Sequence, residues 1–362
     1  GLSFYGRKLL GDSAAVGLFL SLMYIIYALL CLPAQGFNTV SAVGQIVETL
    51  TGQVVPTNSF LYWGSFAVLL VIITASSFGG IKKVTRITDI LVPIMAVIYV
   101  LTVLALILTN FNSIPYFFSA VFVGAFNPEA VFGGALGIAL VQGVKRGLMS
   151  NEAGQGTITM PAAASNAKHT CDQGCIQAVA VFLDTIIICT LTGFVIVMAH
   201  AWQGAGGQAW MELGKLPKFV ASAGILSGSG SDMVVSLLVS LCFGLFAFTS
   251  LLGFMSFTEI CSNRISTSTS FINIIRVLCL VVISFGVLTS IAGLDLGALW
   301  NLSDFANILI AYCNIPLLYI GFKYVQRATA HFEENKGTPF TSDTIGIDVP
   351  VWDEKAKECD CD

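Results

Sequence analysis

The sequence predicts an all-α polytopic membrane protein, and three observations support that prediction. The chain has 362 residues, of which 56% are hydrophobic and only 10% are charged, whereas about 25% of the residues of a soluble domain are charged. Its mean hydropathy is +0.84, and 26 of its residues are Phe. Apolar runs near the ~20 residues needed to cross a bilayer recur along the chain. Lipid is therefore the expected solvent of most of this protein.

The apolar runs define eight candidate membrane-spanning helices. They lie at about 14–33, 62–78, 90–108, 131 onward, 176–199, 233–257, 272–292 and 299–322. The first has an alternative end near Val47, and the fourth is interrupted by polar residues between 131 and 165. The chain begins with Gly1 rather than Met, so we expect a fragment that has lost its beginning.

Basic residues between these segments predict their orientation, because cytoplasmic loops are enriched in Lys and Arg. Only Lys215 and Lys218, in the connection after the fifth helix, oppose the pattern. Both ends of the chain are therefore expected in the cytoplasm, with residues 324–362 as a polar, largely unstructured tail. The loops assigned to the cytoplasm contain Arg7, Lys8, Lys82, Lys83, Arg86, Lys168, Arg264, Arg276, Lys323 and Arg327.

Charge and cysteine content exclude several classes of partner. Nine of the 21 acids behind the formal net charge of −4 follow Lys323, and no basic patch suggests nucleic acid. Most of the ten cysteines lie in apolar runs, where cysteine acts as a small hydrophobic residue. The pairs Cys171/Cys175 and Cys359/Cys361 lack a second pair at zinc-site spacing. Metal binding by these pairs is the weaker interpretation.

The most informative segment runs from Gly147 to Thr157 and contains a carboxylate, amides, hydroxyls and three glycines. Polar, glycine-broken backbone at membrane depth occurs only where it is buried in protein or lines a cavity, and such interruptions mark transporter binding sites. Freed backbone amides favour an anion such as a carboxylate, and freed carbonyls favour a cation. The alternative is structural, with Glu152 in a salt bridge to Lys145 or Arg146 near the cytoplasmic surface.

Two further polar groups lie within predicted helices. Thr249 and Ser250 are adjacent hydroxyls in the sixth helix. They either bond back to a carbonyl of their own turn or provide oxygen ligands for a small, hard cation. Gln35 and Asn38 belong to the polar stretch 35–41, which either lines a pathway or forms bonds between helices.

The eighth helix is polar near its beginning. Asp304 is an acid within or beside the membrane and therefore a functional candidate by default. It is accompanied by Trp300, Ser303, Asn307 and Asn314, all before Pro316.

Catalytic signatures are missing from the sequence. It has no His-Glu-x-x-His, no Gly-x-Ser-x-Gly and no Gly-Lys-Ser/Thr phosphate loop. His169, His200 and His331 are far apart in sequence. We therefore expect neither an enzyme nor an ATP-driven pump, and no organic cofactor.

The central segment resembles a family signature. The residues Gly-Val-Lys-Arg-Gly at 143–147 and Ser-Asn-Glu-Ala-Gly at 150–154 are similar to those of the alanine or glycine:cation symporter family, the sodium:alanine symporters. Further similarity covers Gln173-Gly174, Asp184-Thr185, Cys189-Thr190, the stretch 246–250, and Trp300 with Asp304. The resemblance extends to about Lys323. It departs at Met149, where the family usually has Phe, at 256–259, where it has Tyr-Tyr-Gly-Glu, and at Cys313, where it has Pro.

The resemblance implies the leucine-transporter fold, with two five-helix inverted repeats whose first and sixth helices are unwound at mid-membrane. Residues 1–110 would then supply the last three helices of the first repeat, and 111–323 the whole second repeat. About eight of the ten core helices would be present, and the facing wall of the site would be missing.

The resemblance also implies the residues of the site. Sodium, the coupling ion, would bind Thr249 and Ser250. The walls of the amino-acid site that it implies are Gly147, Met149, Ser150, Asn151, Glu152, Gly154, Gly156 and Trp300. To these the polar stretch of the first helix adds Gln35 and Asn38 as candidates.

The predicted function is sodium-coupled import of a small neutral amino acid, alanine or glycine, across the cell membrane by alternating access. The alternative is a non-coupled channel or an amino-acid sensor that retains the transporter fold.

Overall fold

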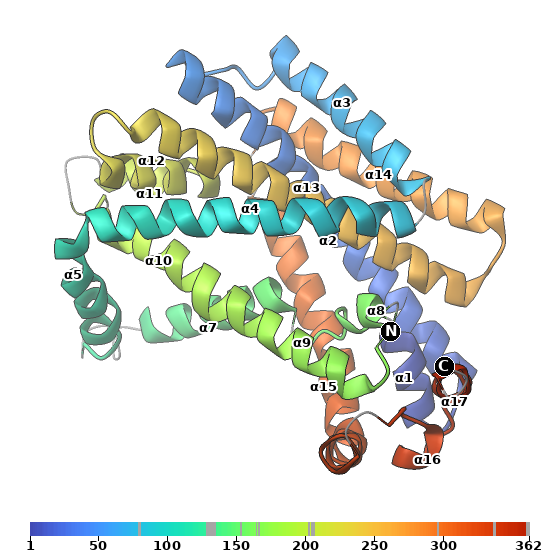
Figure 1. The fold of residues 1–362 in the computed structure, drawn as a ribbon. Helices are drawn as coiled ribbons and strands as arrows, with labels where there is room; N and C mark the ends of the chain where they lie inside the picture. The colour runs from blue at the N-terminus through green and yellow to red at the C-terminus, as the bar shows by residue number, and fades with distance from the viewer. Residues whose placement is uncertain are drawn as a thin grey trace.

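The computed structural model of the protein is helical throughout its described part (Figure 1). No strand occurs among the described residues, which are all except 79–80, 128–134, 153, 164, 166, 202, 204–206, 295–296, 336–337 and 360–362. The fold prediction of an all-α protein is therefore confirmed for this part of the chain.

Seven helices in the described residues are long and apolar enough to cross a membrane. They confirm seven of the eight predicted spans and establish a multi-pass membrane protein. The predicted fourth span begins in residues outside the described part and continues as α7 (Ala135–Asn151), which then breaks. The seven are α2 (Ala14–Thr51), α3 (Phe60–Ser77), α4 (Ile81–Thr109), the continuous segment Thr170–Met198, α13 (Asp232–Ile265), α14 (Thr269–Ile291) and α15 (Gly297–Glu334).

Shorter elements connect these spans. The segment Thr170–Met198 consists of α9 (Thr170–Phe182), the π-helix η3 (Leu183–Ile188) and α10 (Cys189–Met198). The other short helices are α1 (Leu2–Leu9), η1 (Phe111–Ser113), α5 (Ile114–Phe118), η2 (Ser119–Val123), α8 (Thr159–Ala162), α11 (Gly207–Glu212), α12 (Lys215–Ser227), α16 (Ser342–Ile345) and α17 (Pro350–Cys359).

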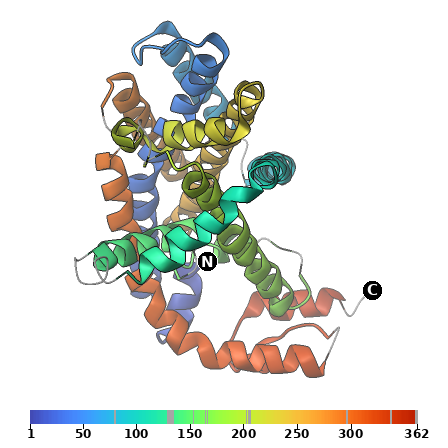
Figure 2. The same ribbon diagram turned by 90° about the vertical axis from the view of Figure 1, so that its left-hand side faces the viewer.

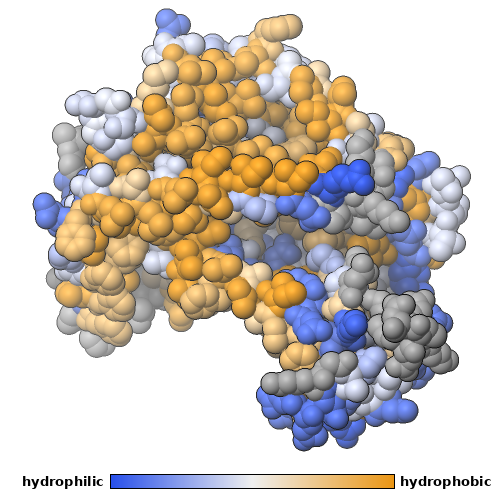
Figure 3. All heavy atoms as spheres, viewed as in Figure 1, coloured by the Kyte–Doolittle hydropathy of each residue, from blue (hydrophilic) through white to orange (hydrophobic). Residues whose placement is uncertain are grey.

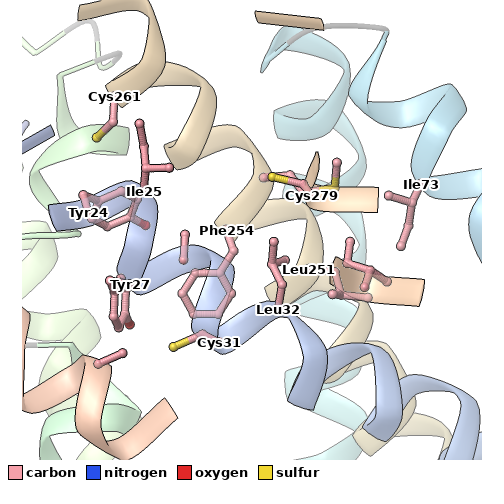
Figure 4. Close-up of a cluster of buried hydrophobic side chains, with 14 of the residues drawn as sticks. Tyr24, Ile25, Tyr27, Cys31, Leu32, Ile73, Leu251, Phe254, Cys261 and Cys279 are labelled. Carbon is pink, nitrogen blue, oxygen red and sulfur yellow. The ribbon is translucent and has the colours of Figure 1, made fainter. Parts of the chain in front are cut away.

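The core forms where α2 crosses α13, α14 and α15. Figure 4 shows Tyr24 and Tyr27 of α2 beside Phe254 of α13, and the rings of Tyr27 and Phe254 meet edge to face at 5.7 Å. Leu251 and Ile283 are fully buried in the same cluster. Since lipid tails are as apolar as these side chains, close packing rather than hydrophobic transfer holds such helices together.

Two glycines allow α2 and α14 to approach closely. A Cβ on Gly286 would lie 2.0 Å from the carbonyl oxygen of Pro33, and a Cβ on Gly36 would lie 2.9 Å from that of Ile283. Small residues at membrane helix crossings let the backbones touch in this way. The close approach of α2 and α14 therefore requires glycine, whose side chain is a single hydrogen atom, at both positions.

Apolar side chains cover much of the outside of the molecule. On α4, Val97, Leu101 and Leu108 are each more than half exposed. Figure 3 shows this apolar surface over most of one face, whereas hydrophilic residues gather at the lower end. Such a surface suits contact with lipid.

The C-terminal segment differs from the predicted unstructured tail. The helix α15 continues beyond Lys323 to Glu334 and contains Pro316, which removes a backbone hydrogen bond and accounts for a bend that Figure 2 shows in α15. The helices α16 and α17 follow at the same end of the molecule as α1 (Figure 1). The prediction of a largely unstructured tail was wrong for these helical segments.

Specific contacts explain the order of this tail. Phe340 is 2% exposed and packs its ring between those of His169 and Trp352. Asp353 accepts hydrogen bonds from the backbone N–H and the hydroxyl of Ser342 at 2.7 and 2.6 Å. The prediction of an unstructured tail was based on its polar composition and did not take account of its few apolar side chains.

The tail also lies beside a histidine pair that joins α9 to α15. His169 Nε2 lies 3.2 Å from His331 Nδ1, while His169 Nδ1 accepts the backbone N–H of Cys171 and caps α9. Burial and the neighbouring His331 lower the pKa of His169, which favours the neutral ring that this capping bond requires. The fold therefore brings together two histidines that are 162 positions apart.

Candidate functional site

The predicted interruption of the fourth helix is present. The helix α7 ends at Asn151, and α8 begins at Thr159. Between them Glu152, Gly154 and Gly156 have φ values of 52°, 92° and 79°. These left-handed conformations suit glycine, which lacks a Cβ, and end the helix. Among the described residues the break thus comprises Glu152 and residues 154–158, within the predicted limits of 131–165.

Buried side-chain amides form hydrogen bonds on the side of the break that faces the protein interior. Gln155 is fully buried, and its Nε2 donates to the Leu148 carbonyl at 2.7 Å and to Asn307 Oδ1 at 3.0 Å. The first bond satisfies a carbonyl near the end of α7, where helical partners are lacking. The second ties the unwound backbone to α15.

Asn314 of α15 holds the two glycines of the break. Its Nδ2 donates to the Gly154 carbonyl at 2.8 Å, and its Oδ1 accepts the hydroxyl of Tyr5 in α1. Gly156 packs beneath this pair, since a Cβ there would lie 2.4 Å from the Tyr5 hydroxyl and 3.1 Å from Asn314. One asparagine therefore connects the break to two other helices.

The last turn of α7 is anchored to the π-helix η3. Ser150 donates its hydroxyl to Asp184 Oδ2 at 2.5 Å, and Asn151 Nδ2 donates to Thr185 Oγ1 at 2.8 Å. Ser150 Oγ also lies 3.2 Å from Cys189 Sγ. A π-helix widens one turn of a helix and often occurs at functional sites. Here it presents two consecutive polar side chains to the break.

The predicted structural alternative for Glu152 was wrong. Glu152 Oε1 accepts the Tyr27 hydroxyl at 3.4 Å. The bases proposed as its partners pair with Asp304 instead: Arg146 Nη2 lies 2.7 Å and Lys145 Nζ 3.9 Å from Asp304 Oδ2. Lys145 and Arg146 precede the break along α7, in which each residue adds about 1.5 Å of rise. Their side chains therefore lie beside the start of α15, where Asp304 is, and not beside Glu152.

The predicted sodium ligands are both hydrogen-bonded within their own helix. Thr249 Oγ1 and Ser250 Oγ lie 3.1 and 2.9 Å from the carbonyl oxygen of Phe246, to which they donate. A hydroxyl that donates its proton keeps oxygen lone pairs as acceptors. The back-bonding expected for such hydroxyls is present, and it leaves their oxygens able to contact a cation.

The remaining predicted site residues either line a separate cavity or lie on α2 and α7 outside it. Asn38 and Trp300 line a cavity of about 570 Å³ between α2, α12 and α15, separate from the described hydrogen bonds of the break. Gln35 does not line this cavity and accepts Thr39 Oγ1 with its backbone carbonyl. Met149 contacts Arg146 through sulfur at 3.4 Å, and Gly147 lies in helical α7 with open space beside it.

The helical architecture and the geometry of the break agree with the sequence comparison. The family profile described as "Sodium:alanine symporter family" matches residues 1–343. The chain belongs to this family.

Several curated relatives in this symporter family are about one-third identical to the chain. The amino-acid carrier protein AlsT of Bacillus subtilis is 33% identical over 260 residues, covering 70% of this chain and 51% of AlsT. The sodium/alanine symporter AgcS of Methanococcus maripaludis is 33% identical over 270 residues, covering 74% of this chain and 56% of AgcS. The probable sodium/glutamine symporter GlnT of Bacillus subtilis is 29% identical over 269 residues, covering 74% and 53%. The chain spans about half the length of the curated relatives it matches.

Several residues beside the break were not among the predicted site residues. Asp184 and Thr185 carried only a family resemblance, although an acid inside an apolar run is itself a signal of function. Tyr27 gave no such signal, because a tyrosine in a membrane helix is common. Gln155 belonged to the predicted interruption, but its contact with Asn307 depends on the packing of distant helices.

Proposed function

We propose that the protein is a sodium-coupled symporter that imports a small neutral amino acid, alanine or glycine, across the cell membrane. The observation that supports this most directly is the unwound segment 152–158 between α7 and α8, in a chain of the sodium:alanine symporter family. The orientation from the basic loops puts the C-terminal tail in the cytoplasm and α12 outside.

The unwound segment offers the groups that an amino acid requires. At the end of α7, backbone carbonyls carry partial negative charge and attract an ammonium group, while freed N–H groups beyond the break attract a carboxylate. Side chains at Gly154 and Gly156 are absent, and the hydroxyl of Ser150 and amide of Asn151 are already engaged by η3. The proposed walls are therefore mainly backbone, which suits a small substrate.

The coupling ion would bind beside α13. Sodium, as a hard cation, prefers oxygen ligands. Thr249 and Ser250 present two hydroxyl oxygens from adjacent positions, each oriented by its bond to Phe246. In this role sodium is transported with the substrate and is not a resident cofactor.

The helix packing suits alternating access on a leucine-transporter-type scaffold. The helices α2, α13 and α14 form the most closely packed part of the described structure, with α3 against them. The unit of α7, the break and α8 is joined to this scaffold by polar contacts, such as that between Tyr27 and Glu152, and by the apolar packing of Met160 in α8. Polar contacts can exchange partners when helices move, whereas the glycine crossing of α2 and α14 cannot. We assign the moving part to α7–α10 and the fixed part to α2, α13 and α14.

A sodium gradient should drive uptake of labelled alanine or glycine by the full-length protein in proteoliposomes. We expect accumulation with an inward sodium gradient and only leak with equal sodium on both sides. Equal, saturable uptake in both conditions would contradict coupling. Flux that does not saturate would indicate a channel, and binding without flux would indicate a sensor.

Removing one sodium ligand should weaken sodium dependence. We expect Thr249→Ala to raise the sodium concentration for half-maximal uptake at least about tenfold, equivalent to ~1.4 kcal/mol. The matched control is Ser284→Ala in α14, which deletes a hydroxyl that likewise bonds back to its own helix, at Leu280. A similar sodium dependence in both variants would remove Thr249 from the proposed site.

A further inference from the structure

The cavity of about 570 Å³ beside α12, here named the α12 cavity, lies outside the amino-acid site of the break. Its volume is within the ~300–1,000 Å³ typical of ligand pockets. Leu213 and Leu294, both exposed, stand among its lining residues and mark an open side. The polar and charged residues that line it are Asn38, Ser41, Gln45, Glu48, Tyr62, Arg146, Lys215, Lys218 and Asn301.

One wall of the α12 cavity has surplus positive charge. Arg146 and Lys215 line it, and Lys145 is the neighbour of Arg146. Asp304 is the carboxylate among these bases, and its Oδ2 is shared by Arg146 and Lys145 at 2.7 and 3.9 Å. Lys215 has no ion pair with any residue in the described part of the chain. Among the described residues, these three cations and one carboxylate leave the wall with two unbalanced positive charges.

Trp300 contacts two of the cavity-lining cations, Lys215 and Arg146. Lys215 Nζ lies 3.4 Å from the centroid of the Trp300 ring, and Arg146 Cζ lies 5.3 Å from it. A cation over an indole face is stabilised by the ring quadrupole, which offsets part of the repulsion between the two bases. The tryptophan thus lies against both positive charges, while Asp304 is ion-paired with Arg146 and not with Lys215.

We propose that the α12 cavity is a second binding site for the amino-acid substrate, in which Lys215 and Arg146 bind its carboxylate. Arg146 supplies planar N–H donors and Lys215 a point charge, a pair suited to a carboxylate. Glu48, on the α2 wall, accepts the Val55 N–H with Oε1 and provides negative charge for the ammonium group. Under the proposed orientation the cavity faces outward, so it captures substrate before the break does. This inference rests on the proposed amino-acid transport.

If Lys215 binds the substrate carboxylate, the affinity of the α12 cavity for the substrate should depend on pH. Burial, and next the charge of Arg146, lower the pKa of Lys215 to about 8, against the opposite effect of Asp304. Because the protonated form binds a carboxylate, substrate affinity should fall as pH rises through about 8. The other titratable or charged groups around Lys215 are Lys145 on α7, Glu48 on α2, Tyr62 on α3, Tyr99 on α4 and Lys218 on its own helix.

The test is sodium-driven alanine uptake by the full-length protein at pH values from 7 to 9. For the natural sequence we expect KM to rise several-fold across this range while the maximal rate changes little. Lys215→Met should show the raised KM already at pH 7, by about fivefold, with no further rise. Lys215→Arg should keep the low KM at every pH, because arginine stays protonated.

Lys323→Met is the matched control, since Lys323 also lies over an aromatic ring, that of Tyr324 at 4.8 Å, and does not line the α12 cavity. It should retain the natural KM and its pH dependence. An unchanged KM and pH profile in Lys215→Met would overturn the proposal. So would a KM that changes when methanesulfonate, which carries no carboxylate, replaces chloride, because the site would then hold an inorganic anion. A natural protein without gradient-driven uptake would instead contradict the proposed function itself.

Discussion

Gly286→Ala should prevent the protein from reaching its native packing. The added Cβ would lie 2.0 Å from the Pro33 carbonyl oxygen and 2.5 Å from two further backbone atoms of Pro33. Backbone atoms of a buried helix cannot rotate away as a side chain can, so α2 and α14 would have to separate. Overpacking typically costs about 1–3 kcal/mol, and contact with backbone places this change at or above the upper end.

The expected result is little monodisperse protein in detergent, measured by size-exclusion chromatography and by thermal unfolding of whatever remains. Gly253→Ala is the matched control, because Gly253 lies in α13 of the same scaffold with nothing within 4 Å of the added Cβ. It should unfold at or above the natural temperature, since alanine favours helix. Native yield from Gly286→Ala would show that α2 and α14 tolerate a wider crossing.

Gly156→Ala should leave the protein folded and reduce uptake by at least about tenfold, or ~1.4 kcal/mol. Two effects act together at this position. Its φ of 79° costs a non-glycine residue about 1–2 kcal/mol, and the added Cβ would lie 2.4 Å from the Tyr5 hydroxyl. Relief requires Tyr5 or Asn314 to move, and Asn314 holds the Gly154 carbonyl.

The measurement is sodium-driven uptake, with thermal unfolding as the check on folding. Adding Tyr5→Phe to Gly156→Ala removes the nearest atom and should recover part of the lost rate, although the strain from φ remains. Gly143→Ala is the control, since Gly143 lies in helical α7 with open space around it. Full activity in Gly156→Ala would mean that the break does not need its observed geometry.

The spans and the break could be predicted because lipid leaves few solutions. A bilayer requires long apolar helices, and it accepts an unwound segment only with internal partners. Glycines at 154 and 156 beside polar residues therefore indicated the break from local sequence alone. Its partners could not be predicted in the same way, since Asn314 lies 160 positions from Gly154.

The pairing of the bases shows a second limit of sequence reading. Lys145 and Arg146 are six or seven positions from Glu152, which made a local salt bridge reasonable. The choice of Asp304 instead depends on how α15 begins beside residues 145 and 146 of α7. The tail illustrates the same limit, because the apolar ring of Phe340 orders it through contacts with His169, far away in sequence, and with Trp352.

The π-helix η3 makes chain length, as well as residue identity, a condition of the site. A π turn accommodates one more residue than an α turn in the same span. If 183–188 formed a regular α-helix with the same number of residues, everything beyond it would rotate by roughly 100°, since an α-helix has about 3.6 residues per turn. Thr192 Oγ1, now 2.5 Å from the Tyr99 hydroxyl, would then face elsewhere, or Asp184 and Thr185 would leave α7. The segment therefore sets the rotation of α10 relative to α9 about their common axis. Insertions or deletions there should be tolerated less well than substitutions.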